Sequence, residues 1–166
     1  MTADEGGHQG GQAHPLREGS ELAGLKLQRL IARDRFCWLW LAAPAEEGSA
    51  QSCVRAIPVA NLSCPDARDR FCSELSFWRN LPGRSAVELY DCGLSGDYCY
   101  MVMRYLPEGS AEFMLQRQET LQDRVPGFAL DFAAALRDLH DNSGAHGNLK
   151  PSNVFPVGEG GVLLSD

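Results

Sequence analysis

The sequence lacks several features that would place it in a specialised class of protein. It has no apolar run near the ~20 residues that a membrane-spanning helix needs, and its start has neither the basic residues nor the apolar stretch of a signal peptide. No two of its cysteines form a CxxC pair, so a zinc site is not expected. Most of them have apolar neighbours, which is typical of reduced, core-filling thiols in a cytoplasmic protein. The six cysteines are at positions 37, 53, 64, 72, 92 and 99.

A surplus of positive charge is absent too. The chain has 15 Lys and Arg against 22 Asp and Glu, which gives a net charge of −7. This balance argues against a general surface for nucleic acid or anionic membranes. The 166 residues fit one domain, and 44% apolar and 22% charged residues are globular values. We therefore expect a globular protein with no nucleic-acid partner and no membrane segment.

Residues 1–20 are rich in Gly, His, Gln and Glu and show no apolar periodicity, so we expect a flexible tail. From Leu22 onward, alternating and densely apolar stretches predict strands, mostly joined as hairpins by polar turns such as RDR at 33–35 and SGD at 95–97. Five strands are predicted, over residues 22–32, 36–42, 52–60, 86–94 and 98–106.

A helix is predicted between the third and fourth strands, over residues 63–83. Ser63 is a plausible N-cap, and Pro82 followed by Gly83 ends the helix. Glu74 lies inside the apolar stripe of this helix, and Arg55 shares a strand face with apolar residues. A buried unpaired carboxylate is costly, so either Glu74 pairs with Arg55 or both side chains reach solvent. The apolar stripe consists of Phe71, Leu75, Trp78 and Leu81.

A second helix is predicted over residues 126–141, where apolar side chains recur at helical spacing. A polar stretch, AHGNLKPSNVF at 145–155, follows this helix. The last stretch, GVLLSD, predicts one more strand that ends at Asp166. The helix spacing rests on Phe128, Phe132, Ala133, Leu136 and Leu139.

This order of elements and motifs resembles the front part of a eukaryotic-type (Hanks-type) Ser/Thr protein kinase domain, of the sort also found in bacteria. HGNLKPSNVF resembles the catalytic loop, H-R-D-L-K-x-x-N, and LLSD resembles the approach to the D-F-G Asp. CVRAIP resembles the third strand, RFCSELSFWRNL resembles helix C, and YMVMRYL resembles the fifth strand and hinge. The resemblance covers residues 22–166.

The resemblance implies an α+β fold. Residues 21–103 would form a kinase-like N-lobe, with a five-stranded antiparallel sheet and helix C. Residues 104–166 would form the hinge and a truncated start of the C-lobe, with helices D and E, a catalytic-type loop and a strand to Asp166. We expect the domain to be truncated after the Asp of D-F-G.

The resemblance also assigns roles to single residues. Asn153 and Asp166 match the two metal ligands, and Lys150 matches the catalytic-loop Lys that meets the transferring phosphate. Glu74 matches the helix C Glu, and Arg55 stands where the family has its phosphate-binding Lys. The resemblance therefore favours a Glu74–Arg55 ion pair.

The hinge region supplies two further nucleotide-site candidates. Met103 matches the gatekeeper, and Tyr105 follows it in the hinge.

Several positions depart from the family pattern. Ala32, Asp34 and Cys37 replace the three glycines of the G-x-G-x-x-G loop, so close backbone approach to phosphates is hindered. Asn148 replaces the Asp that accepts the substrate proton, and an amide cannot take up a proton at neutral pH. Gly147 replaces the Arg that reads a phosphorylated activation loop.

These departures predict a catalytically impaired pseudokinase that acts in binding or scaffolding with a protein partner. Mg-ATP binding is expected to be weak or absent. One alternative is the front part of an active, atypical Ser/Thr kinase, which the retained Lys150, Asn153 and Asp166 favour. The other alternative is an unrelated small α+β interaction domain that mimics the loop by chance.

Overall fold

The computed structural model describes residues 15–46, 48–62, 71, 75–81, 84–117, 125–142, 144–158 and 161–165. Two of the predicted site residues, Glu74 and Asp166, lie outside the described residues. So do Ser63, Pro82 and Gly83, which mark the predicted ends of the first helix.

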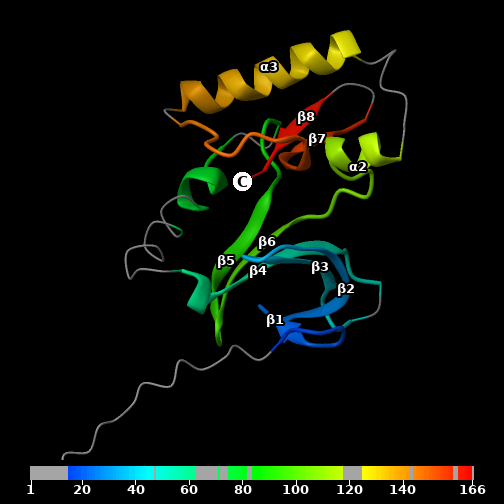
Figure 1. Cartoon of the computed structure of the whole chain (residues 1–166), viewed down its shortest axis with the longest axis vertical. Coiled ribbons are helices and arrows are strands. Elements are labelled where there is room, and N and C mark those ends of the chain that lie inside the picture. Colours follow the sequence, from blue (N-terminus) through cyan, green and yellow to red (C-terminus); the bar gives the residue numbers. More distant parts are fainter. Residues whose placement is uncertain are drawn as a thin grey trace, which may run out of the picture.

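The larger sheet is antiparallel throughout and lies below the other elements in Figure 1. Its strand order is β1-β2-β3-β4-β6-β5, so the five predicted strands are present together with a short additional one. The strands are β1 (Glu21–Leu22), β2 (Leu25–Arg33), β3 (Trp38–Ala43), β4 (Ser52–Pro58), β5 (Leu89–Ser95) and β6 (Tyr98–Arg104).

The additional strand arises because the predicted strand 22–32 is divided by a tight turn. Ala23 and Gly24 both have positive φ, of 56° and 72°, which turns the chain back on itself between β1 and β2. Glycine adopts this conformation at little cost, but Ala23 does so only because the hairpin holds it. β2 then carries two irregularities in its register with β3, between Leu27 and Arg29 and between Leu30 and Ala32.

The segment before β1 is bonded to β2. The amide of Gly19 donates to the carbonyl of Leu27 at 2.8 Å, and the amide of Leu27 donates to the carbonyl of Ser20 at 2.8 Å. Leu16 packs against the core of the sheet. At the end of the predicted tail, Gly19 and Ser20 therefore bond to β2 and Leu16 packs on the core.

The two faces of the sheet bury different clusters, because successive side chains of a strand point to opposite faces. Val54 and Ala56 of β4 belong to a cluster that also holds Trp40 of β3. Cys53, also of β4, belongs to a second cluster with Met103 of β6. Arg55 follows the alternation of Cys53, so it lies on the face of the second cluster.

The second cluster joins the sheet to the elements above it. It contains Leu75 from the helical residues 75–79 and Leu163 from the small hairpin near the end of the chain. This hairpin consists of β7 (Val154–Pro156) and β8 (Val162–Leu164). The sequence predicted only the second of its strands.

Two helices accompany the hairpin, α2 (Ala111–Gln116) and α3 (Val125–Asp141), and α3 lies across the top of Figure 1. α3 matches the predicted helix 126–141. Between these helices and the hairpin lies a third apolar cluster, with Val162 and Leu164 buried at its centre. Two short 3-10 helices, η1 (Val59–Asn61) and η3 (Pro151–Asn153), complete the described elements. None of the helices in the described part of the chain is long and apolar enough to span a membrane.

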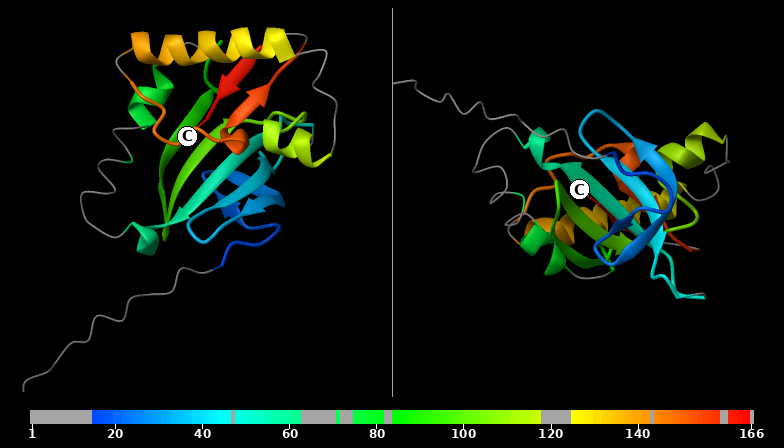
Figure 2. Two further views of the ribbon diagram at one scale, coloured as in Figure 1. Left: turned by 45° about the horizontal axis from the view of Figure 1, so that its top comes forward. Right: turned by 90° about the horizontal axis from the view of Figure 1, so that it is seen from below.

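A parallel bridge ties the hairpin to the segment that leads into β5. Ala86 pairs with Leu164, the amide of Val87 donates to the carbonyl of Leu164 at 2.8 Å, and the amide of Leu164 donates to the carbonyl of Ser85 at 3.0 Å. The left view of Figure 2 shows the hairpin, in orange and red, between α3 and the large sheet. This bridge places the end of β8, and hence the polar residues beside it, next to the large sheet.

Candidate functional site

Asn153 organises the polar stretch after α3. It is buried, with 3% of its surface exposed, and its side-chain Nδ2 donates to the backbone carbonyl oxygen of Asn148 at 2.9 Å. Its own backbone carbonyl accepts from the amide of Ser165 at 3.0 Å. The Asn153 side chain therefore closes the loop of residues 148–153, and the Asn153 backbone carbonyl connects this loop to Ser165, the residue after β8. We call residues 145–153 the polar loop.

Three consecutive side chains of the polar loop face solvent. Asn148, Leu149 and Lys150 are all exposed, and the carbonyl of Lys150 accepts from the amide of Asn153 at 2.9 Å. Gly147, just before them, has a φ of 70°, which residues with a side chain rarely adopt. The structure thus brings the predicted site residues Asn148, Lys150 and Asn153 together on one short loop.

Aromatic rings support the loop from behind. The imidazole of His146 lies edge-on to the indole of Trp78, with 5.4 Å between ring centroids. Gly144 lies against Phe77, so closely that an added Cβ would lie 1.9 Å from the Cζ atom of that ring. Both aromatic residues come from the helical segment 75–79, so this segment fixes the position of the polar loop.

Arg55 lies in the middle of β4, paired with Leu39 of β3 on one side and Met101 of β6 on the other. Its side chain is half-buried, and its charge acts on two acidic groups, the Cys53 thiol and the Asp34 carboxylate. Burial raises the pKa of Cys53 to about 12, although the nearby Arg55 charge opposes the rise. The predicted partner Glu74 lies outside the described residues, so the Arg55–Glu74 ion pair stays a prediction.

The β2–β3 loop, residues 34–37, contains two of the three residues that replace the family's glycines. Oδ1 of Asp34 accepts hydrogen bonds from the amides of Phe36 and Cys37, each at 2.7 Å. The Asp34 amide in turn donates to the Cys37 carbonyl at 3.0 Å, and the Cys37 thiol lies 3.7 Å from Oδ2 of Asp34. Ala32, the third replacement, is exposed on β2 opposite Leu39.

The electrostatics of Asp34 follow from these contacts. Burial by itself would raise the pKa of Asp34, but hydrogen bonds from the Cys37 and Phe36 amides and the Cys37 thiol, together with the Arg55 charge, hold it below its usual value. Asp34 is therefore an anion at neutral pH, fixed inside the loop.

Met103 is buried in β6, where it pairs with Cys53 of β4 and Leu89 of β5. It contributes to the same apolar cluster as Leu163 of β8. Tyr105 is half-buried in the segment that follows β6. The described residues thus place Met103 near β8, whereas Tyr105 has no contact that assigns it to a site.

Sequence reasoning missed Asn61 of η1. Its side-chain Nδ2 donates to the backbone carbonyls of Phe36 at 3.0 Å and Arg35 at 3.3 Å. These contacts bridge 25 and 26 positions of sequence, so no local pattern could have revealed them. A lone Asn after the third strand was the only available signal.

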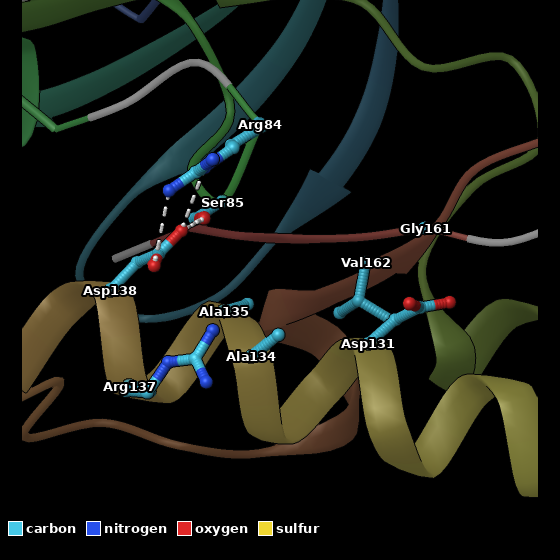
Figure 3. A pocket seen from close by; sticks show the side chains of 9 residues that line it. All are labelled: Arg84, Ser85, Asp131, Ala134, Ala135, Arg137, Asp138, Gly161 and Val162. Atoms are coloured by element: carbon cyan, nitrogen blue, oxygen red, sulfur yellow. Dashed lines mark hydrogen bonds and ion pairs between the residues drawn. The ribbon is translucent and has the colours of Figure 1, made fainter.

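A pocket of about 300 Å³ lies away from these residues, between α3 and the start of β8 (Figure 3). Asp138 of α3 is its most connected side chain. It accepts hydrogen bonds from the Ser85 hydroxyl and from Nε of Arg84, the latter at 3.1 Å. Asp138 therefore joins residues 84–85 to α3. None of the predicted site residues lines this pocket, so the pocket is separate from the candidate site.

Comparison with known proteins places this geometry in context. The sequence profile of the family described as "Protein kinase domain" matches residues 47–166. The mitosis inhibitor protein kinase wee1 of Schizosaccharomyces pombe is 28% identical over 142 residues, which cover 82% of this chain and 16% of that protein. The human serine/threonine-protein kinase ULK1 is 27% identical over 145 residues, which cover 85% of this chain and 14% of that protein.

Solved structures agree at the level of the fold. The crystal structure of a cysteine-to-alanine mutant of the Mycobacterium tuberculosis PknI kinase domain superposes with a TM-score of 0.72 at 21% identity. The match covers 91% of this chain and 62% of that domain. The chain therefore spans less than a fifth of either curated relative and about three-fifths of the solved domain.

The alternative of an unrelated small α+β interaction domain is overturned by the profile match, which extends over well more than half of the chain. The strand order, the helices and the polar loop agree with the same assignment. The chain belongs to the protein kinase domain family.

Proposed function

We propose that this kinase-like domain acts as a pseudokinase, which binds or scaffolds a protein partner and transfers no phosphoryl group. The observation that carries the proposal is the exposed Asn148 at the position of the catalytic base, on a loop that Asn153 holds in place. An amide accepts a hydrogen bond but does not take up a proton at neutral pH. Loss of the general base costs roughly 10²–10⁴-fold in rate.

The residues around the β2–β3 loop do not fit a nucleotide. Protein kinases use Mg-ATP, whose phosphates are held by a glycine-rich backbone and a Lys. Here the amides of Phe36 and Cys37 already bind the Asp34 carboxylate, which would also repel a phosphate. Arg55 offers a planar guanidinium in place of the compact ammonium of Lys. We therefore expect weak or absent Mg-ATP binding.

The proposed setting is the cytoplasm, with a protein as partner. Cys53 and Cys99 are buried thiols in the described part of the chain, which is typical of a reducing compartment. The net charge of −7 disfavours a general nucleic-acid surface. A binding or scaffolding role requires only the folded surface of the domain.

The competing function is that of an active, atypical Ser/Thr kinase. The observation that favours it is Asn153, which is buried and hydrogen-bonded at the position of a metal ligand. A protein that does not catalyse phosphoryl transfer has no need of a metal ligand there. The exposed Lys150 on the same loop also suits contact with a phosphate. Structural support of the polar loop explains Asn153 equally well, and the departures at 148 and in the β2–β3 loop support the pseudokinase over the active kinase.

Calorimetric titration with Mg-ATP tests the proposal. We expect no binding, or binding in the millimolar range. Micromolar affinity would revive the active-kinase alternative. A transfer assay with radiolabelled ATP and the full-length protein should show no labelled substrate. Labelling that is abolished by Asp166→Ala would overturn the proposal.

A further inference from the structure

The β2–β3 loop is closed by a group of its own. In many proteins, successive backbone amides of a turn form a concave site for an anion. In this loop the amides of Phe36 and Cys37 converge on one acceptor, Oδ1 of Asp34, at 2.7 Å each. The Asp34 amide is also bonded, to the Cys37 carbonyl at 3.0 Å. These three loop donors are therefore already satisfied within the loop.

The backbone carbonyls of the loop are hydrogen-bonded as well. Asn61, which ends η1 after β4, donates through Nδ2 to the carbonyls of Phe36 at 3.0 Å and Arg35 at 3.3 Å. The guanidinium of Arg35 lies 4.3 Å from the centroid of the Phe36 ring at the tip. The loop is thus held from within by Asp34 and tied to the end of β4 by Asn61.

Beside its hydrogen bonds, the Asp34 carboxylate feels one positive charge from β4, which is the smallest of the effects on its pKa. Arg55 lies on β4, and its positive charge acts on the Asp34 carboxylate. A bound phosphate in this position would use the same two kinds of partner, backbone amides of the loop and a cation on β4. The carboxylate accepts from these amides at 2.7 Å each and is also attracted by the Arg55 charge, without any ligand.

We propose that the Asp34 carboxylate is a built-in anion, which occupies the phosphate position of the β2–β3 loop. Together with the hydrogen bonds that Asn61 donates to the loop carbonyls, it keeps the loop closed without nucleotide. This inference rests on the proposed function and gives its physical basis at this site. The loop holds one conformation whether or not ATP is present. Any partner that contacts the loop or the exposed Phe36 therefore meets the same surface at every nucleotide concentration.

The test compares the unmodified chain with variants that separate charge from hydrogen bonding. Asp34→Asn removes the charge but keeps an oxygen that can accept from both amides. Asp34→Gly removes the charge and the acceptor and restores a glycine at this position. Asp141→Asn, at the exposed end of α3, is the matched control, because it removes one negative charge far along the chain from the loop.

Two anionic probes are titrated calorimetrically, inorganic tripolyphosphate and Mg-ATP. Removal of a fixed like charge should strengthen anion binding by about tenfold or more in Asp34→Gly and by less in Asp34→Asn. Asp141→Asn should bind as weakly as the unmodified chain. Adding Arg55→Ala to Asp34→Gly should cancel the gain. A gain for tripolyphosphate alone would identify a phosphate position without a nucleotide site, and a gain for both probes would identify a masked nucleotide site; either result supports the built-in anion.

Hydrogen exchange at the Phe36 and Cys37 amides supplies a readout that needs no ligand. Both amides should be protected in the unmodified chain and should exchange about tenfold faster in Asp34→Gly. Asn61→Ala should accelerate the exchange partially. Equal exchange in all variants, or folded Asp34 variants that bind no more anion than the unmodified chain, would overturn the inference and leave the proposed function standing. Micromolar binding of Mg-ATP by the unmodified chain would overturn the proposed function, whereas the exchange rates would still decide whether Asp34 closes the loop.

Discussion

The side-chain amide of the buried Asn153 donates a hydrogen bond of 2.9 Å to the backbone carbonyl oxygen of Asn148. Because the acceptor is backbone, the bond depends on the identity of residue 153 and not of residue 148. Asn153→Ala should leave this carbonyl without its partner and destabilise the fold by about 1–3 kcal/mol. Urea unfolding monitored by tryptophan fluorescence measures the loss.

Asn148→Ala is the matched control for this prediction. The Asn148 side chain is exposed, so its removal should change the free energy of unfolding by no more than about 0.5 kcal/mol. Equal destabilisation by the two variants would show that the Asn148 side chain, and not the backbone bond, supports the loop.

Gly144 leads to a second prediction, since a Cβ there would lie 1.9 Å from the Phe77 ring. Gly144→Ala should force this ring to move and destabilise the protein by about 1–3 kcal/mol. Phe77→Leu should relieve part of the cost in the double variant. Gly127→Ala in α3 is the control, because its added Cβ would meet nothing within 4 Å beyond its chain neighbours and the backbone of its own helix, and Ala favours a helix by about 0.5–1 kcal/mol. A Gly144→Ala variant as stable as the unmodified chain would contradict the close packing.

The elements that the sequence predicts well are those with a long periodic pattern. The apolar spacing of α3 places Leu139 in the core, where it is 2% exposed, and the SGD turn joins β5 to β6 through Gly96 with a φ of 56°. β7 was missed because three residues that end in Pro156 show no periodicity. The division of β1 from β2 was missed because an alanine, such as Ala23, does not indicate a positive φ in a sequence.

The candidate site shows the same limit. The polar loop is recognisable because its residues are adjacent in sequence, and the motif order points to Arg55, Asn148 and Asn153. The closure of the β2–β3 loop could not be predicted in this way. The closure depends on the position of Asn61 after β4. The sheet, and not local propensity, brings Asn61 to Phe36 across 25 positions of sequence.

A third prediction concerns the reactivity of Cys53. Burial raises the pKa of its thiol to about 12, and only the thiolate is nucleophilic. In the native protein at pH 8, Cys53 should resist iodoacetamide, whereas Cys37 in the β2–β3 loop should be alkylated at least about tenfold faster. Peptide mass spectrometry follows each site separately. Unfolding in urea should abolish the difference, and rapid native labelling of Cys53 would contradict its burial.

The last prediction concerns the acid stability that Asp138 confers. The hydrogen bond from the Ser85 hydroxyl lowers the pKa of Asp138, burial opposes this effect, and Arg84 at 3.1 Å lowers the pKa further. A carboxyl with a depressed folded-state pKa stabilises the fold above its unfolded value of about 3.9, and the contribution is lost as the pH falls through the folded value. The unfolded state binds the proton first on acidification, so stability should fall with pH in that window.

Asp138→Asn should remove this part of the acid dependence while it lowers stability at neutral pH. Urea midpoints measured from neutral pH down to about pH 3 give the two curves, which should converge at the acid end. Ser85→Ala should weaken the dependence more than Arg84→Ala does, because the hydroxyl is the larger cause of the lowered pKa. Asp131→Asn is the control, since this carboxylate lines the same pocket but points away from Arg84 and Ser85 in Figure 3. If Asp138→Asn kept the full acid dependence, the link between the 84–85 segment and α3 would have to be assigned to packing rather than to this carboxylate.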